Sequence, residues 1–247
     1  MRHDRRLSEW RAGVRCVLDA ASDAARARSF RLVDTTASAT SPDDTGTGLS
    51  QLVQFENGAS FELREGDIVL TRWNRVFPSF FIALLNDGIS HSAIVLQHDG
   101  QLWNIESSRY APPLPDSEFL RNSRGEIIKR GVHGQLLRHT FGRTIKHLWV
   151  LRPAVPFTDF ELAAMRAEAL RMIDAGTPTT HNYERRVWSR EYLHALCGLR
   201  PYTTSRYMCS ENTAVILRAG GRWGDRSTAV MPSHIRRRVP GPLVKVF

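Results

Sequence analysis

A cysteine stands at a predicted helix start in the stretch RYMCSENTAVIL, which runs from Arg206 to Leu217. Ser210 and Glu211 suit a first helical turn, so Cys209 would lie where free backbone N–H groups and the helix dipole favour negative charge. A thiol attacks as its thiolate, and the same N–H groups can stabilise an oxyanion formed on a carbonyl. The stretch therefore predicts a cysteine nucleophile, provided that a base and a group that orients this base lie nearby.

His91 and Glu106 are the best candidates for the base and the orienting acceptor. His91 opens the apolar run HSAIVL, and Glu106 lies in the run LWNIESS, which follows Asp99-Gly100, a signal for a type I′ hairpin turn. With that turn, His98 pairs with Gln101. His91 and Glu106 then share one face of the hairpin as diagonal neighbours, within reach of long side chains.

Other polar residues compete for these roles. Asn104, on the same face, or His133 could orient the base instead of Glu106, and His181 or His194 could replace His91 as the base. The residues that flank the nucleophile and the base are predicted to contact the substrate; these are Tyr207, Ser210 and Ser90.

The bulk composition is that of an ordinary soluble protein, with 247 residues, 42% hydrophobic and 24% charged. The formal net charge of +9, nearly all of it from arginine, favours an anionic partner such as a phospholipid surface. No recognised nucleic-acid motif accompanies it, so nucleic acid is not expected as a partner. Cys16 and Cys197 are the other cysteines and are predicted to be structural. Three cysteines make no disulfide framework and show no zinc-site spacing, and no metal or organic cofactor is implied.

The sequence lacks the patterns of a classical signal peptide and of a membrane-spanning segment. The stretch Met1 to Phe30 is charged throughout and lacks the apolar core of a signal peptide. No part of the chain approaches the roughly 18–20 apolar residues of a membrane span. We therefore expect synthesis in the cytoplasm and, if the protein is exported, a specialised route.

The chain divides into an extension, residues 1–48, and a main domain, residues 49–247. Apolar residues at helical spacing predict an amphipathic helix over 6–32, basic on its polar face. This helix either packs on the main domain, lies on a membrane surface or serves as a secretion and targeting segment. Thr35 to Gly48 is rich in Thr, Ser, Asp and Gly and is predicted to be a disordered linker.

The main domain reads as strands followed by helices. Strands are predicted at Ile68–Thr71, 91–97, 101–106, within IKHLWVLRPA and at Leu243–Phe247. Helices are predicted at Ser79–Leu85, after a capping box formed by Thr158 and Glu161, and from Cys209 to Gly220-Gly221. Gly176 would end the second of these helices. This order indicates an α+β fold with an antiparallel sheet and helices on one side.

Six short motifs then occur in an informative order: GDIVLTR, SHSAIVL, LWNIESS, LWVLRP, YMCSENTAVIL and MPSHI. In this order, over about residues 62–236, the sequence resembles circularly permuted papain-like enzymes of the NlpC/P60 superfamily, in the YiiX/YebB-like branch related to the lecithin–retinol acyltransferase group. The resemblance implies a permuted papain-like fold, with the sheet or half-barrel packed against helices that include the Cys-bearing one. It also implies His91 as the catalytic histidine, Glu106 as its acidic partner, Cys209 as the nucleophile and Gly66-Asp67 as the family's strand start.

The chain departs from the family pattern at Ala93, where the family often has Gly, and matches a Gly-x-x-Tyr-Asp stretch only loosely, at Gly176 and Asn182–Glu184.

The expected activity is a cysteine hydrolase that cleaves an amide or ester through an acyl-enzyme, as a peptidase or amidase on peptidoglycan peptides or isopeptides. A phospholipid acyl hydrolase or acyltransferase at an anionic membrane is the first alternative. A non-catalytic binding module is the second. Long loops at 107–135 and 177–205 are expected to shape the substrate groove, and the oligomeric state is left open.

Overall fold

The structure, a computed structural model, describes residues 32–38, 49–55, 60–73, 88–108, 114–136, 145–179, 189, 192, 194, 204–224 and 229–246. The strands are β1 (Leu32–Ser38), β2 (Ser50–Phe55), β3 (Ser60–Arg64), β4 (Ile68–Trp73), β5 (His91–His98), β6 (Gln101–Ser108), β7 (Gly131–Leu136), β8 (Ile145–Leu151) and β9 (Leu243–Lys245). The helices with described bounds are α4 (Asp159–Asp174), α7 (Cys209–Ala219) and α8 (Pro232–Arg238), with a 3-10 turn η1 at Asp116–Glu118. This part of the chain is therefore a mixed α+β structure.

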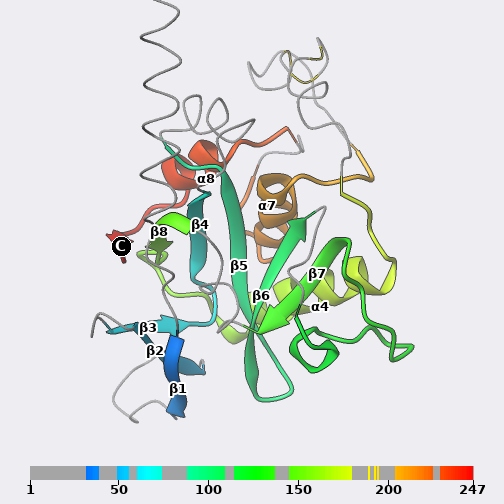
Figure 1. Cartoon of the computed structure of the whole chain (residues 1–247). Helices are drawn as coiled ribbons and strands as arrows, with labels where there is room; N and C mark the ends of the chain where they lie inside the picture. Colours follow the sequence, from blue (N-terminus) through cyan, green and yellow to red (C-terminus); the bar gives the residue numbers. More distant parts are fainter. Residues whose placement is uncertain are drawn as a thin grey trace, which may run out of the picture.

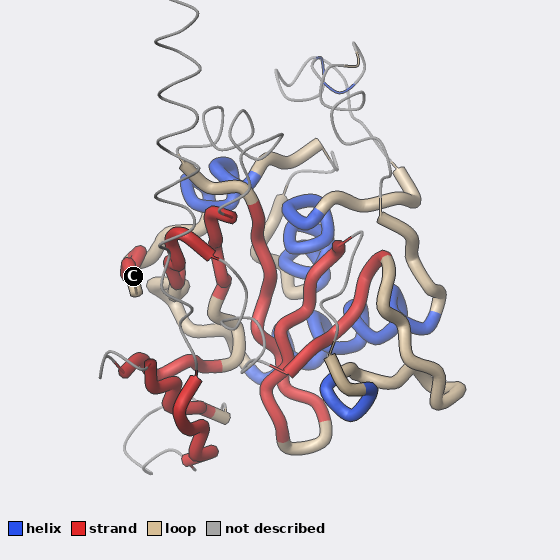
Figure 2. The backbone as a smooth tube through the Cα atoms, in the orientation of Figure 1, coloured by secondary structure: helices blue, strands red, loops and turns tan. Residues whose placement is uncertain are grey.

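The larger sheet has six antiparallel strands in the order β7-β6-β5-β4-β8-β9. Helix α7 packs on β5 and β6, and α4 packs on α7, β5 and β7. Figures 1 and 2 show these two helices beside β6 and β7, with α8 near the ends of β4 and β5. The strand that carries His91 is therefore in contact with the helix that begins at Cys209.

Both faces of the six-stranded sheet are buried, which is why its inner strands are apolar on both sides. Ile68 and Leu70 of β4 join the core shared with the helices, whereas Val69 faces a second cluster. That second cluster contains Val53 and Leu63 of the small antiparallel sheet β1-β2-β3. Because successive side chains of a strand point to opposite faces, the run IVL at the start of β4 contributes Ile68 and Leu70 to one cluster and Val69 to the other.

The predicted β5–β6 hairpin is confirmed. His98 pairs with Gln101, and the two turn residues both have positive φ, 49° at Asp99 and 73° at Gly100, as a type I′ turn requires. The predicted strand at Ile68–Thr71 is confirmed as part of β4, and the strand in IKHLWVLRPA as β8. Of the strand predicted at Leu243–Phe247, the part from Leu243 to Lys245 is confirmed as β9.

The predicted boundaries of α4 are confirmed too. The Thr158 side chain accepts from the Glu161 backbone N–H, and the Glu161 carboxylate accepts from the Thr158 backbone N–H, 2.7 Å away. Gly176 follows the helix with a φ of 58°. A capping box and a left-handed glycine depend only on residues that are close in the sequence, so both can be predicted without knowledge of the rest of the fold.

The predicted linker is wrong at its start, because Thr35–Ser38 belongs to strand β1. Thr35 and Thr36 are β-branched, and they pair with Val53 and Leu52 of β2, so they belong to a sheet rather than to a polar tether. Of the helix predicted over 6–32, the structure describes only Leu32, which also lies in β1; the remainder, and the helix predicted at Ser79–Leu85, lie outside the described residues. None of the helices within the described ranges is long and apolar enough to cross a membrane.

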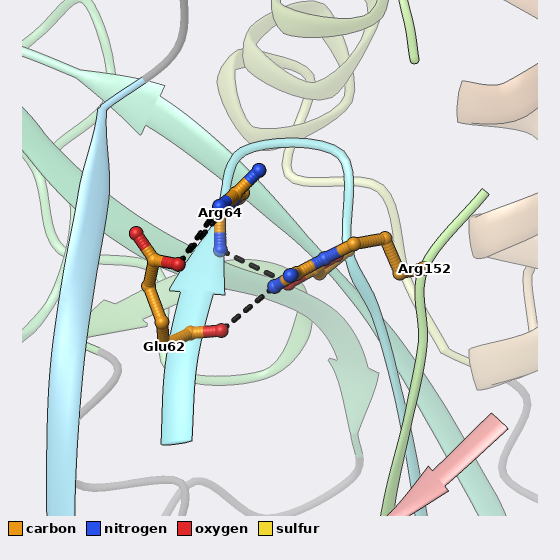
Figure 3. Close-up of polar contacts among 4 residues, drawn as sticks. Glu62, Arg64 and Arg152 are labelled. Atoms are coloured by element: carbon orange, nitrogen blue, oxygen red, sulfur yellow. Dashed lines mark hydrogen bonds and ion pairs between the residues drawn. The ribbon is translucent and has the colours of Figure 1, made fainter. Parts of the chain in front are cut away.

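A buried ion pair joins the small sheet to the large one at the Gly66-Asp67 strand start. The Asp67 carboxylate is buried and accepts from the Arg152 guanidinium at 2.9 and 2.8 Å, as well as from the Arg64 backbone N–H. Arg152 also donates to the Glu62 carbonyl at 2.7 Å, and Figure 3 shows it reaching this strand end beside Arg64. Burial raises the pKa of Asp67 above its usual value, although the Arg152 charge works in the opposite direction.

Candidate active site

Cys209 is the first residue of α7, as predicted, and only 8% of it is exposed. The turn that precedes it is fixed by Glu211, whose buried carboxylate accepts from the Met208 backbone N–H at 2.8 Å. This carboxylate satisfies a backbone donor at the helix start, and an acidic group in the first turn also suits the helix dipole. The backbone N–H of Ser210 remains directed at the Cys209 sulfur.

Hydroxyl groups anchor the start of α7 to the sheet. The carbonyl of Tyr207, two residues before the cysteine, accepts from Ser107 at 2.8 Å and from Thr179 at 3.1 Å. One turn further along, the Thr213 hydroxyl lies 3.3 Å from the hydroxyl of Ser92, the neighbour of His91 on β5. These contacts tie the nucleophile's helix to the strands that carry the base and its acceptor.

His91 and Glu106 meet as the hairpin register predicts. His91 Nε2 lies 3.0 Å from Glu106 Oε2, and the exposed fractions of the two side chains are 13% and 1%. The same oxygen accepts from Asn104 Nδ2 at 3.2 Å. His133, opposite Glu106 on β7, places its Nε2 3.4 Å from the other carboxylate oxygen. Both alternatives for the third role thus contact the carboxylate of Glu106.

The charges of Cys209 and His91 support each other. Burial lowers the pKa of His91, but the Cys209 thiolate and then the Glu106 carboxylate outweigh it and raise this pKa from 6.5 to about 10. Burial raises the pKa of Cys209, but the His91 charge, a hydrogen bond to His91 and backbone N–H groups of Ser92 and Ser210 bring it below its ordinary value. Both directions favour the charged forms, a thiolate on Cys209 and an imidazolium on His91.

His91 supplies both the charge and the side-chain hydrogen bond that lower the pKa of the Cys209 thiol. Since His91 Nε2 is bonded to Glu106, Nδ1 is the ring nitrogen left for the sulfur. The rival base His181 lies outside the described residues, as do Cys16 and Cys197. Among the described residues, no group of three or more His, Cys, Asp or Glu side chains could hold a metal ion.

The predicted substrate contacts need correction at Ser210. Its hydroxyl is buried and donates to the Val230 carbonyl, so it fastens α7 to the segment before α8 and is not available to a substrate. Tyr207 packs its ring against the core shared by the sheet and the helices. The Ser90 hydroxyl lies 3.3 Å from the Thr71 carbonyl on β4, at the strand start beside His91.

The sequence did not predict three residues that help to position the site: Ser92, Ser107 and Thr179. They act through a backbone N–H group or through hydroxyl groups, and no sequence motif contains a signal for such contacts. Ser92 contributes its backbone N–H to the sulfur and its hydroxyl to Thr213. Ser107 and Thr179 act on a carbonyl. The only available signal was that Ser92 and Ser107 are small polar residues in otherwise apolar strand runs.

A scan against models of protein families finds no match, and a search of curated proteins finds none either. What the site can do therefore has to be judged from its own residues and their geometry.

Proposed function

We propose that the protein is a cysteine hydrolase that cleaves an amide or ester bond through Cys209, His91 and Glu106. One observation carries the proposal: a thiol with a lowered pKa, at the first residue of a helix, faces an imidazole whose other nitrogen contacts a buried carboxylate. A cysteine that merely fills a core needs neither an imidazole nor a carboxylate. Burying these charges is costly, which favours a chemical use for them.

The residues can complete a balanced hydrolysis. The Cys209 thiolate adds to the carbonyl carbon, and the backbone N–H groups at the start of α7 are the donors for the oxyanion. The tetrahedral intermediate collapses, the bond to the leaving group breaks, and the leaving group takes a proton from His91. His91 then takes a proton from water as the water attacks the thioester. The acid is released, and the thiolate and the imidazolium are restored.

Glu106 serves this cycle without exchanging a proton. Its carboxylate, 3.0 Å from Nε2, holds the ring with Nδ1 toward the sulfur and favours the charged imidazole. We also propose the permuted papain-like fold of the NlpC/P60 superfamily. The chain order His91, Glu106, Cys209 and the packing of the Cys-bearing helix on an antiparallel sheet support it.

The substrate we favour is a peptide amide or isopeptide, in keeping with this resemblance. A phospholipid acyl substrate is the second candidate, and a particular surface favours it. Arg236, Arg237 and Arg238 are exposed in the last turn of α8, which packs on α7. Together with the net charge of +9, they would attract an anionic membrane toward the helix that carries Cys209.

The proposal is tested by trapping the acyl-enzyme. The protein would be incubated with a panel of activated esters, peptide amides and anionic phospholipid vesicles, and intact mass and peptide mapping would locate any acyl group. We expect a hydroxylamine-sensitive acyl group on Cys209, absent from Cys209→Ala. Acylation at other residues, or none across the panel while the thiol is unreactive, would instead favour the non-catalytic binding module.

A further inference from the structure

Two loops, one after β8 and one after α8, lie side by side at the edge of the large sheet. The backbone N–H of Ala154 donates to the carbonyl of Pro240 at 2.8 Å, and β9, which follows the second loop, pairs with β8. Figure 1 shows β8, α8 and the C-terminal end of the chain on the same side of the view. We call residues 153–156 and 240–242 together the proline ledge.

Several contacts hold the proline ledge in one shape. The backbone N–H of Arg152 donates to the Pro242 carbonyl at 3.2 Å, and Gly241 lies so close that a Cβ there would overlap the Arg152 carbonyl oxygen. The Arg222 guanidinium donates to the Pro156 carbonyl at 2.9 Å. Since proline also fixes its own φ, the ledge is formed before any partner arrives, and binding one costs little ordering entropy.

The surface of the proline ledge is apolar. The runs PAVPF at 153–157 and VPGPLV at 239–244 contain no charged or hydrogen-bonding side chain, and most of their residues are exposed. In the part of the chain that the structure describes, the exposed large apolar side chains are Val155, Val244 and Phe160, at 58%, 40% and 84%. The first two lie in these runs, and Phe160 follows in the first turn of α4. Exposed apolar side chains that gather in one region mark a binding surface.

Exposed cations flank this apolar surface. They lie in the last turn of α8, which leads into the ledge, and on β9, which leaves it; these cations are Arg236, Arg237, Arg238 and Lys245. The segments 152–158 and 236–246 contain no acidic residue. Of the acids that follow in the first turn of α4, Asp159 is exposed and Glu161 is paired with Arg222 at 2.6 Å. The ledge is therefore an apolar surface with positive charge beside it.

We propose that the proline ledge and the cations beside it form a docking surface for an anionic phospholipid bilayer. At such a bilayer, apolar side chains enter the boundary between headgroups and acyl chains, while arginine and lysine contact the lipid phosphates. A nucleic acid would use the cations but would gain nothing from Val155 or Phe160, so the two features together favour the bilayer. The inference goes beyond the proposed hydrolysis, because it does not depend on the chemistry of Cys209.

The test is the binding of the full chain to lipid vesicles, measured by co-sedimentation. The protein carries Cys209→Ala, so that the lipids cannot be cleaved during the measurement. One set of vesicles is phosphatidylcholine alone, and the other is an equimolar mixture of phosphatidylcholine and phosphatidylglycerol. We expect binding to the anionic vesicles and much weaker binding to the neutral ones. No binding to the anionic vesicles would overturn the inference.

Variants in the same background locate the contact. The double substitution of Val155→Ser with Phe160→Ser should weaken binding to anionic vesicles about tenfold, because two exposed apolar side chains are lost. Arg236→Gln should weaken it about fivefold, the contribution of one cation at an anionic surface. Arg124→Gln is the matched control, because Arg124 is also exposed, at 66%, but lies in the loop between η1 and β7, and it should leave binding nearly unchanged. All four side chains are exposed, so these variants should fold as the parent does.

The remaining outcomes are equally distinct. Anionic-vesicle binding that neither the serine variant nor Arg236→Gln weakens would place the membrane contact elsewhere in the chain and overturn the inference. A loss in Arg236→Gln alone, together with equally tight binding to duplex DNA, would replace the bilayer with a soluble polyanion. None of these results bears on the proposed hydrolase, because the protein tested has no thiol at position 209.

Discussion

Replacing Glu106 with Gln tests how the charge of His91 is maintained. The substitution keeps the size of the side chain and its ability to accept from Nε2, but it removes the negative charge 3.0 Å from the imidazole. Burial alone lowers the pKa of His91, and it is the Cys209 and Glu106 charges that bring it up to about 10. In Glu106→Gln, only the Cys209 charge remains to raise the pKa of His91.

The size of the effect follows from that geometry. One opposite charge in direct contact shifts a pKa by about 1–3 units, and each unit corresponds to about 1.4 kcal/mol. We therefore expect the pH at which His91 loses its proton to fall by about 1–3 units in Glu106→Gln. The imidazolium has a raised pKa, so its contribution to the ion pair is complete below pH 6.5 and is lost as pH rises toward 10 in the wild type, and earlier in the variant.

The assay compares an anionic and a neutral alkylating agent at Cys209. Chloroacetate is attracted by the imidazolium beside the thiolate and chloroacetamide is not, so the ratio of their rates across pH reports the charge of His91. We expect this ratio to collapse at lower pH in Glu106→Gln than in the wild type. The same alkaline limb in both proteins would refute the claim that Glu106 sustains the imidazolium.

Three further predictions concern stability. Arg152→Met should lower the free energy of unfolding by about 3 kcal/mol, because it leaves the buried Asp67 carboxylate without its positively charged partner; urea unfolding measures this. Gly66→Ala should cost about 1–3 kcal/mol in the same assay, since φ is +87° there and a Cβ would lie 2.6 Å from a phenylalanine ring. Arg222, by hydrogen bonding, lowers the pKa of Glu161 from 4.5 to about 2. The stability from this pair should be complete above pH 4.5 and lost as pH falls toward 2, and Arg222→Gln should flatten that loss in unfolding curves recorded across pH.

Each of these predictions has its own control. Adding Asp67→Asn to Arg152→Met should recover part of the loss, and an equal or greater loss in the double variant would contradict the ion-pair account. Gly88 has a similar φ of +85°, and among the described residues, its chain neighbours aside, no atom lies within 4 Å of the place that an alanine methyl group would take there, so Gly88→Ala isolates the backbone contribution. An acid-unfolding profile unchanged by Arg222→Gln would show that Glu161 gains nothing from this arginine.

Local signals made much of the fold and the core of the site predictable. Asp99-Gly100 specifies the turn, the turn fixes the register, and the register brings His91 and Glu106 together. The helix start at Cys209 can be predicted for a similar reason, because Ser210 and Glu211 suit the first turn of a helix. These features depend on residues that are close in the sequence.

What escaped prediction depends on contacts between distant segments. His133 faces Glu106 because β7 pairs with β6, and no tight turn between those strands sets that register. Arg152 meets Asp67 across 85 positions of the chain. The helical position of Ser210 predicted a place next to the nucleophile, but only the packing of the segment around Val230 decides that its hydroxyl is buried.

The most direct test of the thiolate–imidazolium pair is the reactivity of Cys209 across pH, measured by chloroacetamide labelling and peptide mass spectrometry on the wild type and His91→Ala. We predict rapid labelling of Cys209 well below pH 7 in the wild type. In His91→Ala, rapid labelling should require alkaline pH, because burial then raises the pKa of the thiol without opposition from the imidazolium. Labelling of Cys209 only at alkaline pH in both proteins would contradict the thiolate–imidazolium pair and, with it, the proposed hydrolase.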